Sequence, residues 1–263
     1  MIIRFEFKKF LKEPSNLIFL LGLPIIMLFI LGKTSPGFSA SELLKHISIP
    51  EDYQSVMVKQ DGLKMVYDIM DYFGVTMLMM LTFLTCVLGA NSFSEEYRLK
   101  TINRYFCSGK SRTVIFIQKV LGLVIIAAAE LLFFFVIAKL LFGIQFAKGR
   151  DEEFMILAMA FENSLVMLVA GSMLGMIFKK NTLPFIMPFF CIMMLFGGTF
   201  TGNIYIAGLS EAMPIYQMQI AAFRLGTLHS YELIRPIMLI EGLILIVLFI
   251  GAFFMFHKQD EVR

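Results

Sequence analysis

Apolar runs of about twenty residues, separated by short charged or polar stretches, form the dominant pattern of this chain. A bilayer core of ~30 Å is crossed by a helix of about 20 apolar residues. Six runs are long enough or nearly so, and the pattern therefore predicts an all-α membrane protein with six transmembrane helices in a single domain, 1–263. The predicted spans are 16–32, 72–93, 114–143, 154–178, 183–201 and 236–257. Pro24 is expected to kink the first span, and Pro184 and Pro188 are expected to bend the start of the fifth.

Residues 1–15 have an amphipathic pattern that is too short to cross a bilayer. A helix ending before Pro14 would place its apolar and basic side chains on opposite faces. We predict an interfacial (elbow) helix at the inner membrane surface, with a disordered tail as the alternative. The apolar face holds Ile3, Phe7, Phe10 and Leu11, and the basic face holds Arg4, Lys8 and Lys12.

The segment 202–235 has an apolar helical stretch, 215–228, that is too short and too polar to span. It follows the sequence FGGTFTGN, whose glycines allow sharp backbone turns. We predict a re-entrant or interfacial helix just before the last span, and a small extracytoplasmic cap is the alternative. Residues 38–71 are expected to form an outer loop with short helices.

The composition supports a membrane location. Hydrophobic residues make up 58% of the chain and charged residues only 16%, where a soluble chain would carry about 25% charged residues. The net charge of +3 is too small, and the basic residues too scattered, to indicate a nucleic-acid partner. Cys86 and Cys191 lie in apolar runs and Cys107 in a charged stretch, so no disulfide is expected.

The distribution of lysine and arginine sets the orientation. With both termini in the cytoplasm, the inner segments hold 13 basic residues against 8 in the longer outer segments. The positive-inside rule therefore favours cytoplasmic termini and places residues 94–113 in the cytoplasm.

A fragment of a nucleotide-binding motif, Gly109-Lys110-Ser111, lies in this charged segment. A P-loop needs an earlier glycine and a preceding buried strand, so that successive backbone N–H groups surround the phosphates. Here Arg104 occupies the position of that glycine, and the residues before it are typical of a charged helix. We therefore do not expect nucleotide binding on this chain.

An intramembrane CAAX-type protease is an alternative, because Glu95-Glu96 with Lys100 is close to the EExxxR motif of those enzymes. They use glutamates and histidines within the membrane to activate a water. His46, His229 and His257 lie outside the predicted mid-membrane region and have no partner at metal-ligand spacing, so no metal or catalytic residue is assigned. A secondary transporter is a further alternative, but no inverted repeat is visible.

Several charged or polar residues fall within the predicted spans. Burying such a group in a bilayer costs ~2.5–3.5 kcal/mol, so each is a candidate functional residue. Glu130, Glu162 and Asn163 are candidates for a translocation path, and the alternative is a simple hydrogen bond to a neighbouring helix. Glu241 lies near the start of the last span, while Lys119 and Lys139 are expected to snorkel from opposite ends of the third.

The charged segment is expected to continue the second span as a helix. Leu99, Ile102 and Phe106 would then form an apolar stripe, and Glu96 would pair with Lys100 on a solvated face. A plain solvated loop does not need such a stripe beside ordered charge, whereas a docking surface for a soluble partner does.

In its span order and in this segment, the chain resembles the type-2 ABC transporter permeases. Many of them carry E-x-x-x-G-T after the second span, and here Glu95, Glu96, Arg98, Lys100 and Thr101 occupy that position, with Lys100 in place of the glycine. The resemblance implies coupling to an ATPase through residues 94–113. The implied contact residues are Glu95, Glu96, Arg98, Leu99, Lys100, Thr101, Ile102, Arg104 and Phe106.

The resemblance also implies partners and a location. A full transporter has two permeases, identical or homologous, and two ATPase subunits that bind ATP and Mg, so this chain would carry no cofactor and would not itself be an enzyme. It would be a multi-pass protein of a bacterial cytoplasmic membrane. The 20 methionines, 29 phenylalanines and absence of tryptophan favour export of an amphipathic or hydrophobic peptide, lipopeptide or drug over a sugar.

Overall fold

The computed structural model describes most of the helical part of the chain. The described residues are 2–12, 22–34, 69–102, 107, 109–179, 182–196 and 213–258. They contain the helices α1 (Ile2–Lys12), α3 (Leu23–Thr34), α6 (Ile69–Arg98), α8 (Arg112–Phe142), α9 (Arg150–Phe178), α10 (Leu183–Phe196), α11 (Pro214–Leu228) and α12 (Ile234–Lys258). No strand occurs in this part of the chain, so the predicted all-α fold is confirmed there.

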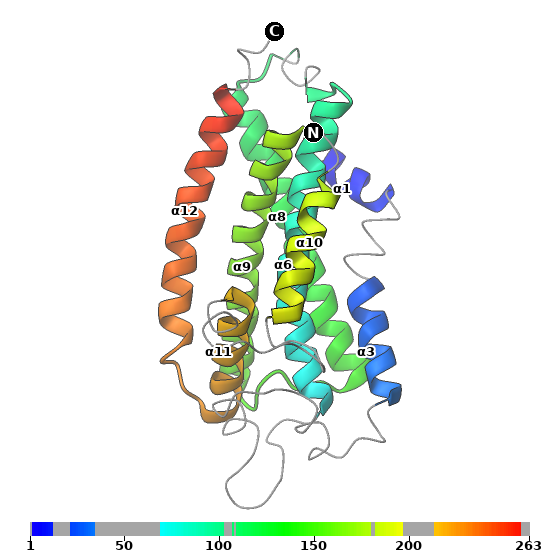
Figure 1. The fold of residues 1–263 in the computed structure, drawn as a ribbon, viewed down its shortest axis with the longest axis vertical. Coiled ribbons are helices and arrows are strands. Elements are labelled where there is room, and N and C mark those ends of the chain that lie inside the picture. Colours follow the sequence, from blue (N-terminus) through cyan, green and yellow to red (C-terminus); the bar gives the residue numbers. More distant parts are fainter. Residues whose placement is uncertain are drawn as a thin grey trace, which may run out of the picture.

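The helices form an elongated bundle (Figure 1). Four of them, α6, α8, α9 and α12, are long and apolar enough to cross a membrane. They correspond to the predicted spans 72–93, 114–143, 154–178 and 236–257. The first and fifth predicted spans coincide with α3 and α10, which have 12 and 14 residues. The adjoining stretches 13–21 and 197–201 lie outside the described residues, and the six-span count remains a prediction.

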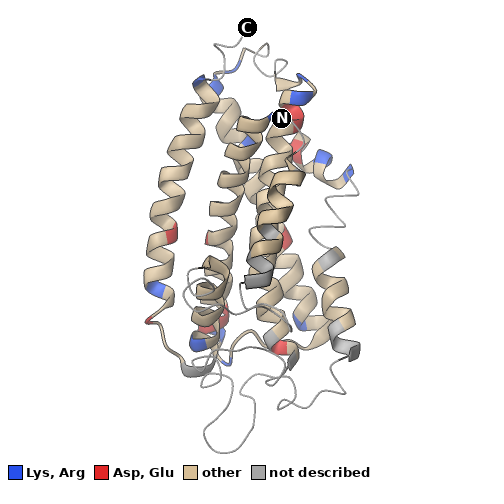
Figure 2. Cartoon of the chain, in the orientation of Figure 1, with Lys and Arg blue, Asp and Glu red and all other residues tan. Residues whose placement is uncertain are grey.

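The two ends of the bundle differ. The C-terminal ends of α6 and α12 lie at one end, called here the 99–111 end, and α11 lies near the other, called the α11 end (Figure 1). Charged residues gather near these ends, and few occur along the helix shafts (Figure 2). The long shafts are therefore the apolar part of the bundle, as a bilayer requires.

Helices α6 and α9 make the closest backbone approach. A Cβ added at Gly171 would overlap the backbone carbonyl of Cys86, and one at Gly175 would overlap that of Ala90. Small residues spaced four apart let two helix backbones approach in this way. Across the same interface, the Thr85 hydroxyl donates to the carbonyl of Ser164 at 3.0 Å. Because α6 also contacts α3, α8, α10 and α11, it lies at the centre of the bundle.

Aromatic rings fill the core at the 99–111 end. Phe116 of α8 lies 5.3 Å from Phe256 and 5.6 Å from Phe249 of α12, measured between ring centroids. Phe93 of α6 lies 6.2 Å from Phe256. Offset and edge-to-face pairs at these distances are favourable. They hold α6, α8 and α12 together where the charged connection begins.

Helix α1 differs in orientation from the prediction. Phe10, predicted to share a membrane-facing side with Phe7 and Leu11, is buried, whereas Phe7 is 42% and Leu11 52% exposed. The reason is that α1 lies against α8, so the side that carries Glu6 and Phe10 faces protein. The predicted helix is confirmed, but part of its apolar face packs against protein through Phe10 while Phe7 and Leu11 stay exposed, and its interfacial location remains a prediction.

Helix α11 confirms the helical stretch predicted for 215–228. Pro214 occupies the first turn, where a missing N–H costs nothing, and the helix ends at His229 with φ of 53°. Tyr216, Met218 and Phe223 are almost completely buried, and α11 contacts α6, α9 and α12. Its path through a membrane remains a prediction.

Candidate functional site

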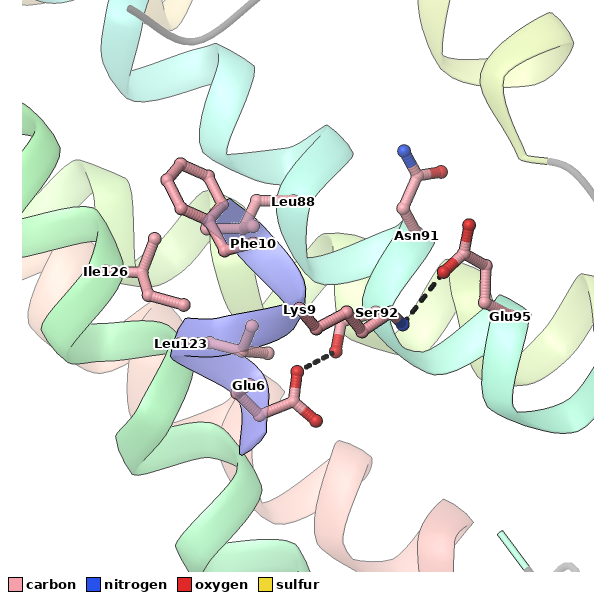
Figure 3. Close-up of a pocket in the computed structure, with 9 residues that line it drawn as sticks. All are labelled: Glu6, Lys9, Phe10, Leu88, Asn91, Ser92, Glu95, Leu123 and Ile126. Carbon is pink, nitrogen blue, oxygen red and sulfur yellow. Dashed lines mark hydrogen bonds and ion pairs between the residues drawn. The ribbon is translucent and has the colours of Figure 1, made fainter. Parts of the chain in front are cut away.

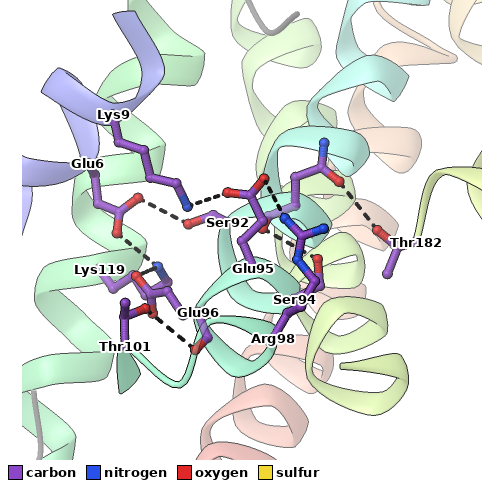
Figure 4. A network of polar contacts seen from close by, with 11 residues as sticks. Glu6, Lys9, Ser92, Ser94, Glu95, Glu96, Arg98, Thr101, Lys119 and Thr182 are labelled. Atoms are coloured by element: carbon purple, nitrogen blue, oxygen red, sulfur yellow. Dashed lines mark hydrogen bonds and ion pairs between the residues drawn. The ribbon is translucent and has the colours of Figure 1, made fainter. Parts of the chain in front are cut away.

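A buried lysine joins three helices at the 99–111 end. The ammonium of Lys119, on α8, donates to a carboxylate oxygen of Glu6 on α1 at 2.8 Å and to one of Glu96 on α6 at 2.5 Å (Figure 4). All three residues are at most 3% exposed. The predicted snorkelling of Lys119 is therefore wrong, because two anions bind its ammonium inside the protein. We call Glu6, Glu96 and Lys119 the buried triad.

The close approach of α1 to α8 makes the triad possible. A Cβ at Gly122 would lie 3.3 Å from the Cβ of Glu6 and 3.4 Å from the Cα of Ile3. A larger side chain at 122 would push α1 outward. Glycine at this position therefore lets Glu6 reach Lys119, which lies one helical turn earlier on α8.

Further bonds orient Glu6. The hydroxyl of Ser92 donates to its second carboxylate oxygen at 3.0 Å (Figure 3). Burial alone would raise the pKa of Glu6, but the charge and hydrogen bond of Lys119, aided by Lys9 and Ser92, lower the pKa below its ordinary value. Glu6 is thus held as an anion, which is the form that binds Lys119.

A second ion pair lies on the side of α1 nearer to solvent. Lys9 binds Glu95 at 2.8 Å, and this pair and Phe10 line a small pocket between α1, α6 and α8 (Figure 3). Glu95 also approaches Arg98 at 4.0 Å. Consecutive residues Glu95 and Glu96 therefore both bind lysines, one near the surface and one in the core.

The connection after α6 departs from the predicted helix. Helix α6 ends at Arg98, Lys100 has a φ of 54°, and the Thr101 N–H donates to the Glu96 carbonyl at 3.0 Å. This turn directs Leu99 outward, where it is 62% exposed, and Ile102 inward, where it is 5% exposed. The predicted stripe shared by Leu99 and Ile102 is therefore wrong.

The prediction for Glu96 also needs correction. Glu96 does not lie on a solvated face, and it binds Lys119 in place of the predicted partner Lys100. The reason is that α8 presents an ammonium on the inner side of α6, while Lys100 lies beyond the helix end. Arg98, Leu99 and Lys100 are the exposed residues here, and we call them the α6 tip. Arg104 and Phe106 lie outside the described residues.

Gly109, Lys110 and Ser111, which resemble the end of a P-loop motif, lie in the turn before α8 and at its N-terminus. Ser111 is the N-cap of α8, where its hydroxyl accepts a hydrogen bond from the Val114 N–H. Gly109 adopts a φ of 73°, a conformation that glycine adopts without strain. Lys110 donates to the side chain of Gln118 at 3.3 Å. The fragment thus ends a turn and begins a helix.

The polar residues within the shafts fall into two groups. Asn163 donates to the Thr82 hydroxyl at 2.6 Å and so joins α9 to α6. This contact matches the simple hydrogen bond considered as the alternative to a translocation role. Glu130 is 3% exposed, and neither of its carboxylate oxygens has a hydrogen-bond partner among the described residues.

Glu162 faces a different helix from its neighbour Asn163. Its carboxylate lies beside α12, where a Cβ at Gly242 would be 3.0 Å from an oxygen of Glu162. Glu241, the residue before that glycine, is 8% exposed and interacts electrostatically with Glu162. The structure therefore places the carboxylate of Glu162 beside the stretch of α12 that carries Glu241, a proximity that the sequence did not indicate. In the described ranges, no group of three or more potential ligands is arranged for a metal ion.

Residues 1–222 of the chain match the model of the ABC-2 type transporter family. The chain belongs to this family. No curated protein and no solved structure matches it. Membership confirms the resemblance inferred from residues 94–113 and implies a membrane context and an ABC ATPase partner. Members are transport components and do not carry catalysis themselves.

In this ABC-2 family chain, the residues that sequence reasoning missed are Glu6 and Lys119. Glu6 is an acid on the side of α1 that also carries Ile3 and Phe10. Lys119 lies seven residues into an apolar span. An acid on an apolar face and a cation inside a span each require a buried partner. That signal was present in the sequence, but it did not identify which residues form the pair.

Proposed function

We propose that this chain is the membrane-spanning permease subunit of an ATP-driven exporter, and that a separate ATPase docks at residues 94–113. The observation that carries the proposal is the buried triad. Because Glu96 at the end of α6 binds Lys119 of α8, which also binds Glu6 of α1, a force on the connection would act on three helices at once. This linkage suits an element that transmits movement from a soluble motor.

Two groups of residues would contribute to coupling between this chain and the ATPase. The α6 tip offers the ATPase an exposed apolar side chain, Leu99, between two cations. Charges at such contacts mainly set orientation, and buried apolar residues supply most of the affinity. Glu95, Glu96, Thr101 and Ile102 would hold the tip in place from within, and Arg104 and Phe106 complete the proposed contact set.

The proposed topology follows from charge and span length. Six spans with both termini in the cytoplasm of a bacterial cell would place the 99–111 end inside, next to the ATPase. α1 would lie in the inner interface, and 202–235, which includes α11, would be extracytoplasmic and re-entrant. A second permease, identical or homologous, would complete the path, and ATP and Mg would bind only to the partner ATPase.

The proposed cargo is an amphipathic or hydrophobic peptide, lipopeptide or drug. Glu130, Glu162 and Asn163 are the residues proposed to line the path. Support comes from the methionine- and phenylalanine-rich spans and from carboxylates buried along them. Family membership disfavours the alternatives of a secondary transporter and a CAAX-type protease.

Co-purification tests the proposal. A tagged chain is solubilised from its native membranes, and the bound proteins are identified by mass spectrometry. An ATPase with Walker motifs should co-purify, and Arg98→Glu should reduce its yield strongly while Arg98→Lys retains it. Absence of any ATPase, or equal recovery with Arg98→Glu, would contradict docking at this segment.

A further inference from the structure

Two carboxylates lie on the neighbouring helices α9 and α12 within the shafts, on the half of the bundle nearer the α11 end. Glu241 lies seven residues after the first residue of α12, at a depth of about 10 Å along that helix. Glu162 lies twelve residues after the first residue of α9, at a depth of about 18 Å. Figure 2 shows an acidic position part-way along α12, between charged ends. Glu241 is buried and Glu162 is half-buried.

The hydrogen-bonding capacity of Glu241 is not fully used by the described part of the protein. Glu241 is 8% exposed, and one of its carboxylate oxygens has no hydrogen-bond partner among the described residues. Glu162 and Glu241 repel each other when both are ionised, and the burial of Glu241 strengthens this repulsion. A positive group placed between them would remove the repulsion and supply the missing donor.

Gly242 leaves room for the carboxylate of Glu162 beside α12. An added Cβ there would lie 3.0 Å from a carboxylate oxygen of Glu162, so that the acid would have to shift by a few tenths of an ångström. Helix α12 thus carries Glu241, and the next residue, Gly242, leaves space that the carboxylate of Glu162 on α9 occupies.

An apolar groove begins beside the same acid. It runs between α8 and α9 and is lined entirely by apolar side chains, which include Leu131, Phe154, Leu157 and Phe161. Phe161 directly precedes Glu162, so the groove and the carboxylate pair occupy adjacent faces of α9. A ligand that reached both would need an apolar body and a positive head.

We propose that Glu162 and Glu241 form a subsite for the positively charged nitrogen of an amphipathic substrate, whose apolar body lies in the groove beside Phe161. This inference rests on the proposed export function and narrows its cargo to cationic amphipaths. Neutral amphipaths of the same length would leave the two acids without a counter-charge, and their binding would be correspondingly weaker.

Binding to the chain alone tests this inference without any ATPase. The chain has no tryptophan, so Phe161→Trp provides a single fluorescent reporter in the groove. The variant is placed in phosphatidylcholine nanodiscs at neutral pH and titrated with 11-bromoundecylamine or 11-bromoundecanol, whose bromine quenches tryptophan at short range. Concentrations are expressed as mole fraction in the membrane, measured with protein-free discs, so that unequal partitioning is removed.

The amine should half-quench at a membrane fraction about tenfold lower than the alcohol, because a hydrogen bond to a charged group is worth more than one to a neutral group. In the Phe161→Trp background, Glu162→Gln and Glu241→Gln should each abolish that preference. Glu232→Gln, which changes an exposed acid before α12, should retain it. Equal quenching by both probes, or a preference that survives either glutamine variant, would overturn the proposal.

A further variant covers the case in which a glutamine variant is not recovered as folded protein. Gly242→Ala keeps both acids and displaces Glu162, so it should reduce the preference for the amine, and an unchanged preference would count against the subsite. The readout needs neither transport nor a partner. A failed export assay with a retained amine preference would therefore count against the proposed function and leave the subsite standing.

Discussion

The ammonium of Lys119 lies 2.5 Å from a carboxylate oxygen of Glu96, and both residues are almost completely buried. The same ammonium binds Glu6, so one cation compensates two anions from different helices. Removing one partner of a buried ion pair leaves an uncompensated charge, which costs about 3–5 kcal/mol. The triad is therefore a place where small changes have large structural effects.

Neighbouring glutamates should respond very differently to substitution. Glu96→Gln should lower the temperature at which the purified chain aggregates in detergent, because it removes the shorter of the two charge-assisted hydrogen bonds of the buried ammonium of Lys119. Glu95→Gln, which disrupts a pair nearer the surface, should change it little. Size-exclusion chromatography after heating measures both, and equal midpoints would argue against an energetic role for the triad.

Neutralising the whole triad should be milder than removing its cation alone. Lys119→Met leaves two buried carboxylates without a counter-charge, whereas combining it with Glu6→Gln and Glu96→Gln leaves no charge. The triple variant should therefore recover part of the stability lost in the single variant. A triple variant less stable than Lys119→Met would show that the acids are held by other contacts.

Acid should weaken the attachment of α1. The folded pKa of Glu6 lies below the ordinary value of 4.5, so its contribution to stability is complete above that pH and is lost as the pH falls through the folded pKa. Heating midpoints compared at pH 7 and pH 4 should fall more for the parent chain than for Glu6→Gln. Identical pH dependence of the two chains would contradict the assignment of Glu6 as a bound anion.

Glycines of the α6–α9 interface should not tolerate a methyl group. Gly171→Ala places a Cβ onto the backbone of Cys86, and overpacking of this kind costs about 1–3 kcal/mol. Gly251→Ala is the matched control, since its Cβ would lie 3.4 Å from the flexible end of Met173. Folded yield and heating midpoint should fall only for Gly171→Ala. A loss of equal size at Gly251 would indicate a general intolerance of helix changes.

The proposed orientation can be tested with the exposed thiol of Cys107. In a variant with Cys86 and Cys191 replaced by alanine, a membrane-impermeant maleimide should label Cys107 only after permeabilisation or in inside-out vesicles. In a cysteine-free chain, Ser230→Cys should be labelled in intact cells, because it follows α11 at the opposite end. Labelling of Cys107 from outside would reverse the topology and remove the proposed ATPase contact.

The sequence by itself determined the class of protein and most of its long helices. Helices α6, α8, α9 and α12 were predictable because a bilayer leaves no backbone polar group unbonded, so a long apolar run forms a helix wherever it lies. Helix α11 was predictable from its own periodicity, and the segment after α6 indicated the family that residues 1–222 match. All of these are properties of short stretches of chain.

Only the tertiary structure decided which polar side chains meet. Lys119 binds Glu6 and Glu96, which are 113 and 23 positions away. Glu162 faces Gly242 of α12, while its neighbour Asn163 bonds Thr82 of α6. These pairings depend on the rotation and crossing of whole helices. One residue changes the direction of a side chain by about 100° on a helix. Sequence spacing within a span therefore cannot tell which neighbouring helix a buried charge will face.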